Sequence, residues 1–302
     1  MRQFVAKHHR AALVATLVAA TACAGSDADR CDLPSDCPSN YCRADHTCAP
    51  VDDADGGVDA PGGGPDAPLG CQPDHDGTLT RDELRMMPGQ VARFRIATGA
   101  TVDTAGNQGA GGERTWTLAA GLPGDQDLTV TLTPPTGQWW AATFPTASYA
   151  ARLSIDSSLL GVMRLDASGL ALLGVVSPEA GITRTELSYD PPVPLLPTPL
   201  APSSSWTTTS TVSGLAQGVA AFYSERYQAR VDAVGTLSTP FGPFPVRRIA
   251  TDLTRTVGAA VVTRRTFAFA AECYGTVATI TSRDYESGSE FTTAAEVWRL
   301  VP

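Results

Sequence analysis

The sequence predicts a mainly β protein in which a single large antiparallel β domain, either a half-barrel or a sandwich, occupies residues 90–302. Residues 91–98 alternate apolar and charged side chains, and residues 128–132 alternate Leu and Val with Thr. This period of two is typical of strands that bury one face. No segment keeps a helical period over several turns. Ahead of the domain we expect a signal peptide, a small disulfide module and a disordered linker.

The predicted strands follow one another along the domain and are separated by Gly and Pro residues. They cover residues 91–98, 128–132, 149–155, 160–166, 169–177, 182–189, 219–237, 244–255, 261–273, 276–282 and 291–300. Thr239–Gly242 has the Pro and Gly positions of a type I turn, which would join Glu225–Ser238 to Phe244–Arg255 as a long hairpin. The apolar run Leu170–Val176 fits a strand buried on both faces. The proline run Pro191–Pro202 is interpreted as a crossing segment.

Residues 1–22 are typical of a signal peptide. Arg2, Lys7 and Arg10 make a basic start, and the apolar stretch 11–22 is too short to span a bilayer. This pattern predicts export from the cytoplasm.

The apolar stretch ends in Ala20-Thr21-Ala22-Cys23, which resembles the lipobox of bacterial lipoproteins. The resemblance implies that Cys23 is acylated, that residues 23–30 form a lipidated N-terminus, and that the membrane is a partner through this anchor. Since Ala24 follows instead of Asp, the rule for such proteins implies the outer membrane or the cell surface. Ala20 replaces the usual Leu, so cleavage to a secreted protein without lipid stays open.

The seven cysteines divide into three groups. With Cys23 assigned to lipid, six remain, an even number that suits disulfides in an oxidising compartment. Four lie in a module of residues 31–48 that resembles small EGF-like repeats, namely Cys31, Cys37, Cys42 and Cys48. Metal ligation helped by His46 is the alternative, but two disulfides are favoured because the module has no CxxC pair. The remaining Cys71 and Cys273 are expected to bond to each other.

Residues 49–70 form a low-complexity linker of Asp, Gly, Pro and Ala, which cannot bury a core and is expected to be disordered. Residues 24–76 hold 12 acidic residues against two arginines, whereas the body that follows is close to neutral. A nucleic-acid partner would require a basic patch, so we expect none.

Residues 72–83 resemble an EF-hand calcium loop that closes at Glu83. The resemblance implies weakly bound calcium as a cofactor. The oxygen ligands would come from Gln72, Asp74, Asp76, Thr78, Thr80 and Glu83. The first position lacks its usual Asp, and the preceding Gly and Pro residues exclude an entering helix. The alternative is a capped turn within residues 71–89, because Thr80 and Glu83 have the spacing of a capping box for a short helix, Arg81–Met87.

The sequence argues against an enzyme. No histidine lies beyond His75, and the single lysine is Lys7. The β domain therefore lacks the residues for Ser-His-Asp or Cys-His catalysis, for a multi-histidine zinc site and for a Schiff base. Paired carboxylates remain conceivable, as in a hydrolase of envelope polymers. The candidate acids Glu225, Asp232, Asp252 and Glu272 lie beside arginines, so we interpret them as solvated surface charges.

Two clusters have a structural and a functional interpretation. Trp139-Trp140, with Phe144 and Tyr149, would form either a sugar-binding platform or, more simply, a corner of the core. Pairing across strands with Asp232 or Glu272 is simpler than anion binding for two arginine pairs, Arg247-Arg248 and Arg264-Arg265.

The C-terminal half carries several stretches, Tyr189–Leu196, Trp206, Thr239–Gly242 and Ala271–Val277, that together resemble uncharacterised lipoproteins of myxobacteria. That family implies no activity. We therefore expect a membrane-anchored extracytoplasmic lipoprotein with a non-enzymatic binding or structural role, whose partner is an unknown protein or an apolar ligand. Its architecture is also similar to that of LolA/LppX-like lipoproteins, which carry acyl chains in a half-barrel.

The lipid anchor is tested by Cys23→Ser. The variant should lose acyl labelling and leave the detergent phase, because no other residue would hold the chain at a membrane. Phase partitioning and labelling with a radioactive fatty acid measure both effects. Wild-type protein that is already soluble and unacylated would contradict the anchor.

Overall fold

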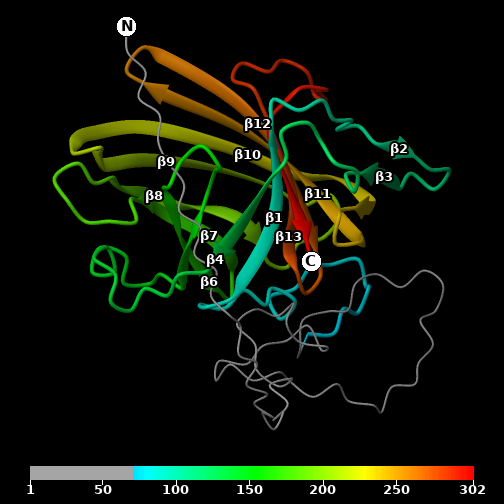
Figure 1. Cartoon of the computed structure of the whole chain (residues 1–302), viewed down its shortest axis with the longest axis horizontal. Helices are drawn as coiled ribbons and strands as arrows, with labels where there is room; N and C mark the ends of the chain where they lie inside the picture. Colours follow the sequence, from blue (N-terminus) through cyan, green and yellow to red (C-terminus); the bar gives the residue numbers. More distant parts are fainter. Residues whose placement is uncertain (1–70) are drawn as a thin grey trace, which may run out of the picture. The chain divides into compact units, whose positions relative to one another are not determined.

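The computed structural model describes residues 71–302, and in this range it confirms the predicted fold class: all regular structure is β, and there is no helix (Figure 1). The strands are β1 (Val91–Thr98), β2 (Asn107–Gln108), β3 (Arg114–Thr117), β4 (Gln126–Thr131), β5 (Tyr149–Arg152), β6 (Leu160–Asp166), β7 (Gly169–Val176), β8 (Glu186–Pro197), β9 (Ser205–Ala216), β10 (Val219–Ser238), β11 (Pro243–Val257), β12 (Ala260–Ala271), β13 (Gly275–Ser282) and β14 (Ala294–Val301). The predictions for Cys23, for the cysteines of residues 31–48 and for the linker lie outside the described residues. Between residues 71 and 302, no helix is long and apolar enough to cross a lipid bilayer.

Twelve of the strands form one antiparallel sheet that nearly closes into a barrel. Their order is β4-β1-β14-β13-β12-β11-β10-β9-β8-β7-β6-β5. The two edge strands meet where Thr133, just beyond β4, pairs with Ala150 of β5 through two N–H···O bonds of 2.8 Å. β2 and β3 lie off this path, and β3 runs parallel to the end of β10. The sheet is therefore closed further than the predicted half-barrel.

Side chains fill the interior of the sheet. One continuous cluster of buried apolar residues, the inner cluster, joins strands from opposite sides of the barrel. It includes Ile96 of β1, Leu172 of β7, Val212 of β9 and Trp298 of β14. Because neighbouring residues of a strand point to opposite faces, the alternating sequence places this apolar set inside.

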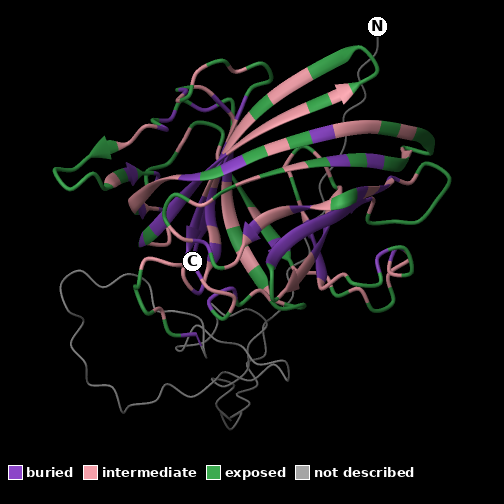
Figure 2. Cartoon of the chain, turned by 180° about the vertical axis from the view of Figure 1, so that it is seen from behind, coloured by how far each residue is buried: buried purple, intermediate pink, exposed green. Residues whose placement is uncertain are grey.

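The segment between β1 and β4 and the segment between β4 and β5 each cover part of the outer face and form a further buried cluster there. Trp116 of β3 packs with Phe269 and other residues of the central strands, and Trp140 and Phe144 pack over the outer face near β7. As a result every residue of β7 is buried, which confirms burial on both faces of Leu170–Val176. In Figure 2 the buried residues gather in the barrel, and the ends of the long hairpins are mostly exposed or intermediate.

The hairpin prediction is confirmed. β10 pairs with β11 from Ser224↔Thr256 to Ser238↔Pro243, and Thr239 and Gly242 exchange N–H···O bonds of 2.9 and 3.1 Å at the turn.

The interpretation of Pro191–Pro202 as a crossing segment is wrong over Pro191–Pro197, which belong to β8. Prolines have no N–H for a ladder, and the pairing of β8 with β9 ends just before them at Asp190↔Thr211. Side chains of β9 bond to the proline carbonyls instead. The Ser210 hydroxyl donates to the Pro191 carbonyl at 2.7 Å, and the Trp206 indole donates to that of Pro194 at 3.0 Å.

The sequence analysis missed β9, Ser205–Ala216. In the structure Ser210 and Val212 are buried between exposed neighbours. The sequence shows no matching alternation of hydrophobicity, because both buried and exposed positions hold Ser or Thr. The run of β-branched Thr residues was the signal for a strand, but it is too polar for a search based on hydrophobicity.

Residues 71–90, here called the plug segment, fill one end of the barrel. Leu79 and Leu84 are buried in the inner cluster, and Leu79 bonds to Leu200 through two backbone bonds of 3.0 and 2.9 Å. The predicted helix Arg81–Met87 is wrong. Only one bond, from the Leu84 N–H to the Arg81 carbonyl at 3.2 Å, closes a turn there, because the chain is held by the barrel rather than by its own helical bonds.

The predicted disulfide is confirmed. Cys71 and Cys273 are bonded, with their Cα atoms 5.7 Å apart. The backbone N–H of Cys273 also donates to the carbonyl of Glu83 at 2.9 Å. The turn between β12 and β13, which carries Cys273, is thus attached to the plug segment at two points, Cys71 and Glu83.

Replacing Cys71 and Cys273 together by Ser should lower the free energy of unfolding by on the order of 4–5 kcal/mol, because the bond closes a loop of 202 residues in the unfolded chain. Denaturant unfolding of the double variant measures the loss, and the wild type in reductant is the matched comparison. Equal stability of variant and wild type would contradict the role of the bond.

Candidate functional site

Three carboxylates meet at the plugged end of the barrel. One oxygen from each of Asp74, Glu83 and Glu272 can be chosen so that all three atoms lie within 4.8 Å of one another. Asp74 is exposed, Glu83 is buried, and Glu272 lies between these extremes. Asp74 and Glu83 belong to the plug segment, and Glu272 begins the turn after β12, so the barrel brings together residues that are far apart in the sequence.

The structure gathers only part of the ligand set predicted from the EF-hand resemblance. Asp74 and Glu83 belong to the acidic cluster, whereas the Asp76 carboxylate does not. The Asp76 Oδ1 accepts the N–H of Thr78 at 2.6 Å, and the Asp74 Oδ1 accepts the N–H of Asp76 at 3.0 Å, as in ordinary Asx turns. Gln72 is exposed in the same segment.

The structure shows one of the two hydrogen bonds of the predicted capping box, from the Thr80 N–H to the Glu83 carboxylate; the Thr80 hydroxyl also donates to this carboxylate, and no helix follows. The Glu83 Oε2 accepts both the N–H and the hydroxyl of Thr80 at 2.8 Å. Glu83 is only 4% exposed, and its other oxygen, Oε1, has no hydrogen-bond partner among the described residues.

Arg247 and His75 adjoin the cluster at Glu272. The Glu272 Oε1 accepts from Arg247 Nη2 at 3.0 Å, and its Oε2 accepts the backbone N–H of His75 at 3.1 Å. The His75 Nδ1 lies 3.3 Å from the same Oε2, on a side chain that is 65% exposed. Arg247 Nε also donates to the Gly77 carbonyl at 3.0 Å, which fixes the turn between Asp74 and Glu83. Sequence analysis missed Glu272 as a possible ligand because no local spacing connects it to the loop.

The four acids considered for hydrolysis are held by arginines, and their interpretation as solvated charges is wrong for three of them. The side chain of Glu225 is fully buried, and those of Asp232 and Glu272 are 14% and 9% exposed. Pairing with Asp232 or Glu272 is confirmed for Arg248, 2.8 Å from Asp232, and for Arg247, 3.0 Å from Glu272. It is wrong for Arg264 and Arg265, which pair with Asp284 and Asp252.

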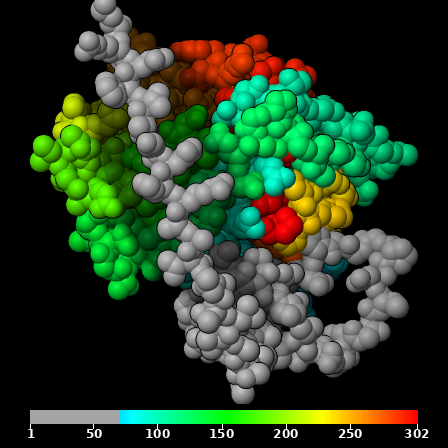
Figure 3. All heavy atoms as spheres, viewed as in Figure 1, coloured from blue at the N-terminus to red at the C-terminus, as the bar shows by residue number. Residues whose placement is uncertain are grey.

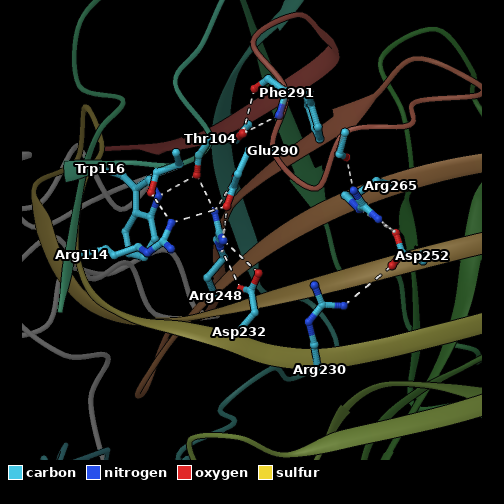
Figure 4. Close-up of polar contacts among 12 residues, drawn as sticks. Thr104, Arg114, Trp116, Arg230, Asp232, Arg248, Asp252, Arg265, Glu290 and Phe291 are labelled. Carbon is cyan, nitrogen blue, oxygen red and sulfur yellow. Dashed lines mark hydrogen bonds and ion pairs between the residues drawn. The ribbon is translucent and has the colours of Figure 1, made fainter. Parts of the chain in front are cut away.

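Arg248 is the centre of a buried network on the outer face of the sheet (Figure 4). Its guanidinium, 1% exposed, bonds to Asp232 of β10 at 2.9 and 2.8 Å and to Glu290 at 2.7 and 3.1 Å. It also donates to the Thr104 carbonyl, which accepts the Trp116 indole N–H at 2.9 Å. Two carboxylates thus flank one guanidinium, and Arg114, 3.5 Å from Glu290, supplies a second positive charge. This arrangement favours a structural role, the attachment of two loops to the sheet.

A second ion-pair chain in Figure 4 joins neighbouring long strands. Asp252 of β11 lies 2.6 Å from Arg265 of β12 and 3.8 Å from Arg230 of β10.

Glu225 lies on the inner face of β10, toward the end opposite the plug. It pairs with Arg255 of β11 at 2.6 Å and accepts a hydrogen bond from the Tyr227 hydroxyl. Burial raises the pKa of Tyr189 and Tyr227, and the nearby Glu225 charge raises both further, so neither phenol is an acid near neutral pH.

The core interpretation of the tryptophan pair is confirmed for Trp140, which is fully buried. The Trp139 indole donates to the Ser177 carbonyl at 3.2 Å, and Arg184 lies 5.6 Å from the centre of its ring.

The long hairpins carry exposed apolar side chains at the end of the sheet away from the plug. This set, here called the distal apolar set, consists of Ile182, Val219, Phe222, Val257, Val261 and Tyr285. Phe222 is 76% exposed and Val219 69%. Strand pairing places Phe222 and Val261 on one face and Val219 and Val257 on the other. In Figure 3 the yellow-green region around the β9–β10 turn projects from the described part of the chain.

A shallow cavity of about 270 Å³ lies at the seam of the sheet, beside Thr131, Arg152 and Leu160. Its lining comes from the two edge strands, β4 and β5, and from β6, which adjoins β5, so it marks the place where closure is incomplete.

Comparisons with family models, with curated proteins and with solved structures gave no match to this chain.

The Arg248 network predicts a pH dependence of stability. Burial is the largest single effect and raises the pKa of Glu290. The hydrogen bonds from Arg248 and Thr104 and the charges of Arg248 and Arg114 together outweigh it, so the pKa lies below its ordinary 4.5. A carboxyl group whose pKa is lower in the folded than in the unfolded state stabilises the fold above pH 4.5. This stabilisation is lost as the pH falls through the pKa of the folded state.

Glu290→Gln should therefore lower the free energy of unfolding at pH 7 and reduce its decline between about pH 5 and pH 3. Urea unfolding across this range measures both effects, with the exposed Glu113→Gln as the matched control. A decline as steep as in the wild type would show that Glu290 does not contribute.

Proposed function

We propose that the chain is a membrane-anchored extracytoplasmic lipoprotein that binds an envelope protein and has no catalytic role. The anchor is the acylated Cys23, and the binding surface is the face of the distal apolar set that carries Phe222 and Val261. The observation that carries the proposal is the exposure of Phe222 and its neighbours at the ends of two long hairpins. Exposed aliphatic and aromatic side chains that gather in one region are typical of protein interaction surfaces.

The length of the strands supports this assignment. β9 to β12 have 12 to 20 residues, whereas β13 and β14, which adjoin them in the sheet, have 8 each. The extra length carries Val219, Val257 and Val261 to the ends of the hairpins, and Phe222 lies close to its own hairpin end with its side chain 76% exposed. Hydrophobic residues at such tips do not contribute to the core, so their presence calls for a role in binding.

The inner cluster favours a surface binder over a carrier of apolar ligands. A carrier needs an apolar space inside the sheet. Here Leu79 and Leu84 of the plug segment and inward side chains such as Trp298 occupy the interior. The hydrolase alternative has less support, because the candidate acids are paired with arginines.

A photoreactive amino acid at position 222 tests the proposal in cells that make the full chain. It should give an adduct of one discrete larger mass, because Phe222 would lie in the interface. The matched control is position 228, where Gln228 is exposed on the same face of the same strand. A probe at Val261 should lose its adduct when Phe222→Ser is introduced.

Three results would contradict the proposal. These are equal labelling at positions 222 and 228, no adduct at 222 or 261, and an adduct with the mass of two copies of the chain, which would indicate self-association.

A further inference from the structure

We propose that Asp74, Glu83 and Glu272 bind a calcium ion, which links the plug segment to the turn between β12 and β13. This site differs from an EF-hand loop, since one of its ligands comes from the far end of the chain. It does not depend on the proposed binding surface, which lies at the opposite end of the sheet.

The spacing of the oxygens fits one ion. Calcium binds oxygens at about 2.3–2.6 Å, so two ligands of one ion lie at most about 5 Å apart. The chosen oxygens of Asp74, Glu83 and Glu272 lie within 4.8 Å of one another. Three carboxylates so close together repel one another unless a cation compensates their charge, and Arg247 supplies only one positive charge.

The buried oxygen of Glu83 provides independent support. A carboxylate oxygen that is removed from water without a partner is costly. The Glu83 Oε1 is in this position among the described residues, on a side chain held in place by Thr80 and only 4% exposed. A calcium ion between Glu83 and Glu272 would satisfy this oxygen.

The scaffold holds the ligands before an ion binds. The Cys71–Cys273 disulfide and the hydrogen bond from the Cys273 N–H to the Glu83 carbonyl, 2.9 Å long, join the two segments beside the cluster. Glu272 precedes Cys273 directly. Little conformational entropy is therefore lost when the ion brings the ligands together.

The ligand chemistry favours calcium over zinc. All three groups are hard carboxylate oxygens, which suit calcium, whereas zinc prefers sites with His or Cys. His75 lies against Glu272, yet its nitrogens are not among the atoms of the cluster. Asp76, which an EF-hand would require, bonds to the Thr78 N–H and lies outside the cluster.

Thermal unfolding of the purified full chain in chelator and in 10 mM calcium tests the site. For affinities of about 10⁻⁴–10⁻³ M, calcium should raise the Tm by about 3–10 °C. The rise should persist in Asp76→Asn and His75→Ala and disappear in Asp74→Asn and Glu272→Gln. Because Asp74 is exposed, Asp74→Asn preserves the fold even if Glu272→Gln weakens it.

The opposite pattern would overturn the proposal. If Asp76→Asn abolished the rise and Glu272→Gln kept it, calcium would bind to an EF-hand-like loop. If the wild type melted at the same temperature in chelator and calcium, there would be no calcium site. A larger rise with zinc that His75→Ala removes would assign the cluster to a transition metal.

Discussion

The structure depends on filling the interior of a sheet that closes on itself. Eight strands leave a space that strand side chains can fill, and larger barrels need further material inside or enclose a channel. Here twelve strands nearly close, and the plug segment supplies Leu79 and Leu84 at one end. At the other end the loop after β5 is held by Glu296 of β14, which accepts the Ile155 N–H at 2.7 Å. The disulfide and the Leu79–Leu200 pairing keep the plug segment in this position.

On the outer face, buried arginines attach the loops to the sheet, whereas inside the barrel apolar packing holds the segments together. Buried guanidinium groups of the sheet hold the long loops: Arg248 binds Asp232, Glu290 and the Thr104 carbonyl, and Arg299 binds Asp125 and, at 2.7 Å, the Ala120 carbonyl. A guanidinium has five donors in a planar fork, so one side chain can join groups from several segments.

The features that sequence could predict depend on local pattern or on counting. Alternation placed β1 and β6 at their observed bounds, the Pro and Gly of Thr239–Gly242 gave the hairpin turn, and cysteine arithmetic gave Cys71–Cys273. These predictions needed no knowledge of neighbours in space.

The features that were missed depend on contacts between distant residues. The proline part of β8 belongs to a strand because it pairs with β7, from Leu172↔Val193 to Gly169↔Pro197, while β9 side chains bond to its carbonyls on the other side. Glu272 reaches the acidic cluster only through the closed barrel. The helix predicted at Arg81–Met87 failed for the same reason, since packing of Leu79 and Leu84 outweighs a local capping signal. The β9–β10 hairpin was missed with β9, and recognising the exposed apolar surface at the hairpin ends requires the fold.

We propose that the protein's own side chains fill the interior and that binding takes place at its exterior. Native mass spectrometry of the chain purified from membranes in mild detergent tests this division most directly. The account predicts the mass of the processed chain with its covalent acyl groups and no further bound lipid. A stoichiometric lipid that survives transfer and is displaced only on unfolding would contradict it, because such a lipid would require an interior that Leu79, Leu84 and Trp298 do not fill.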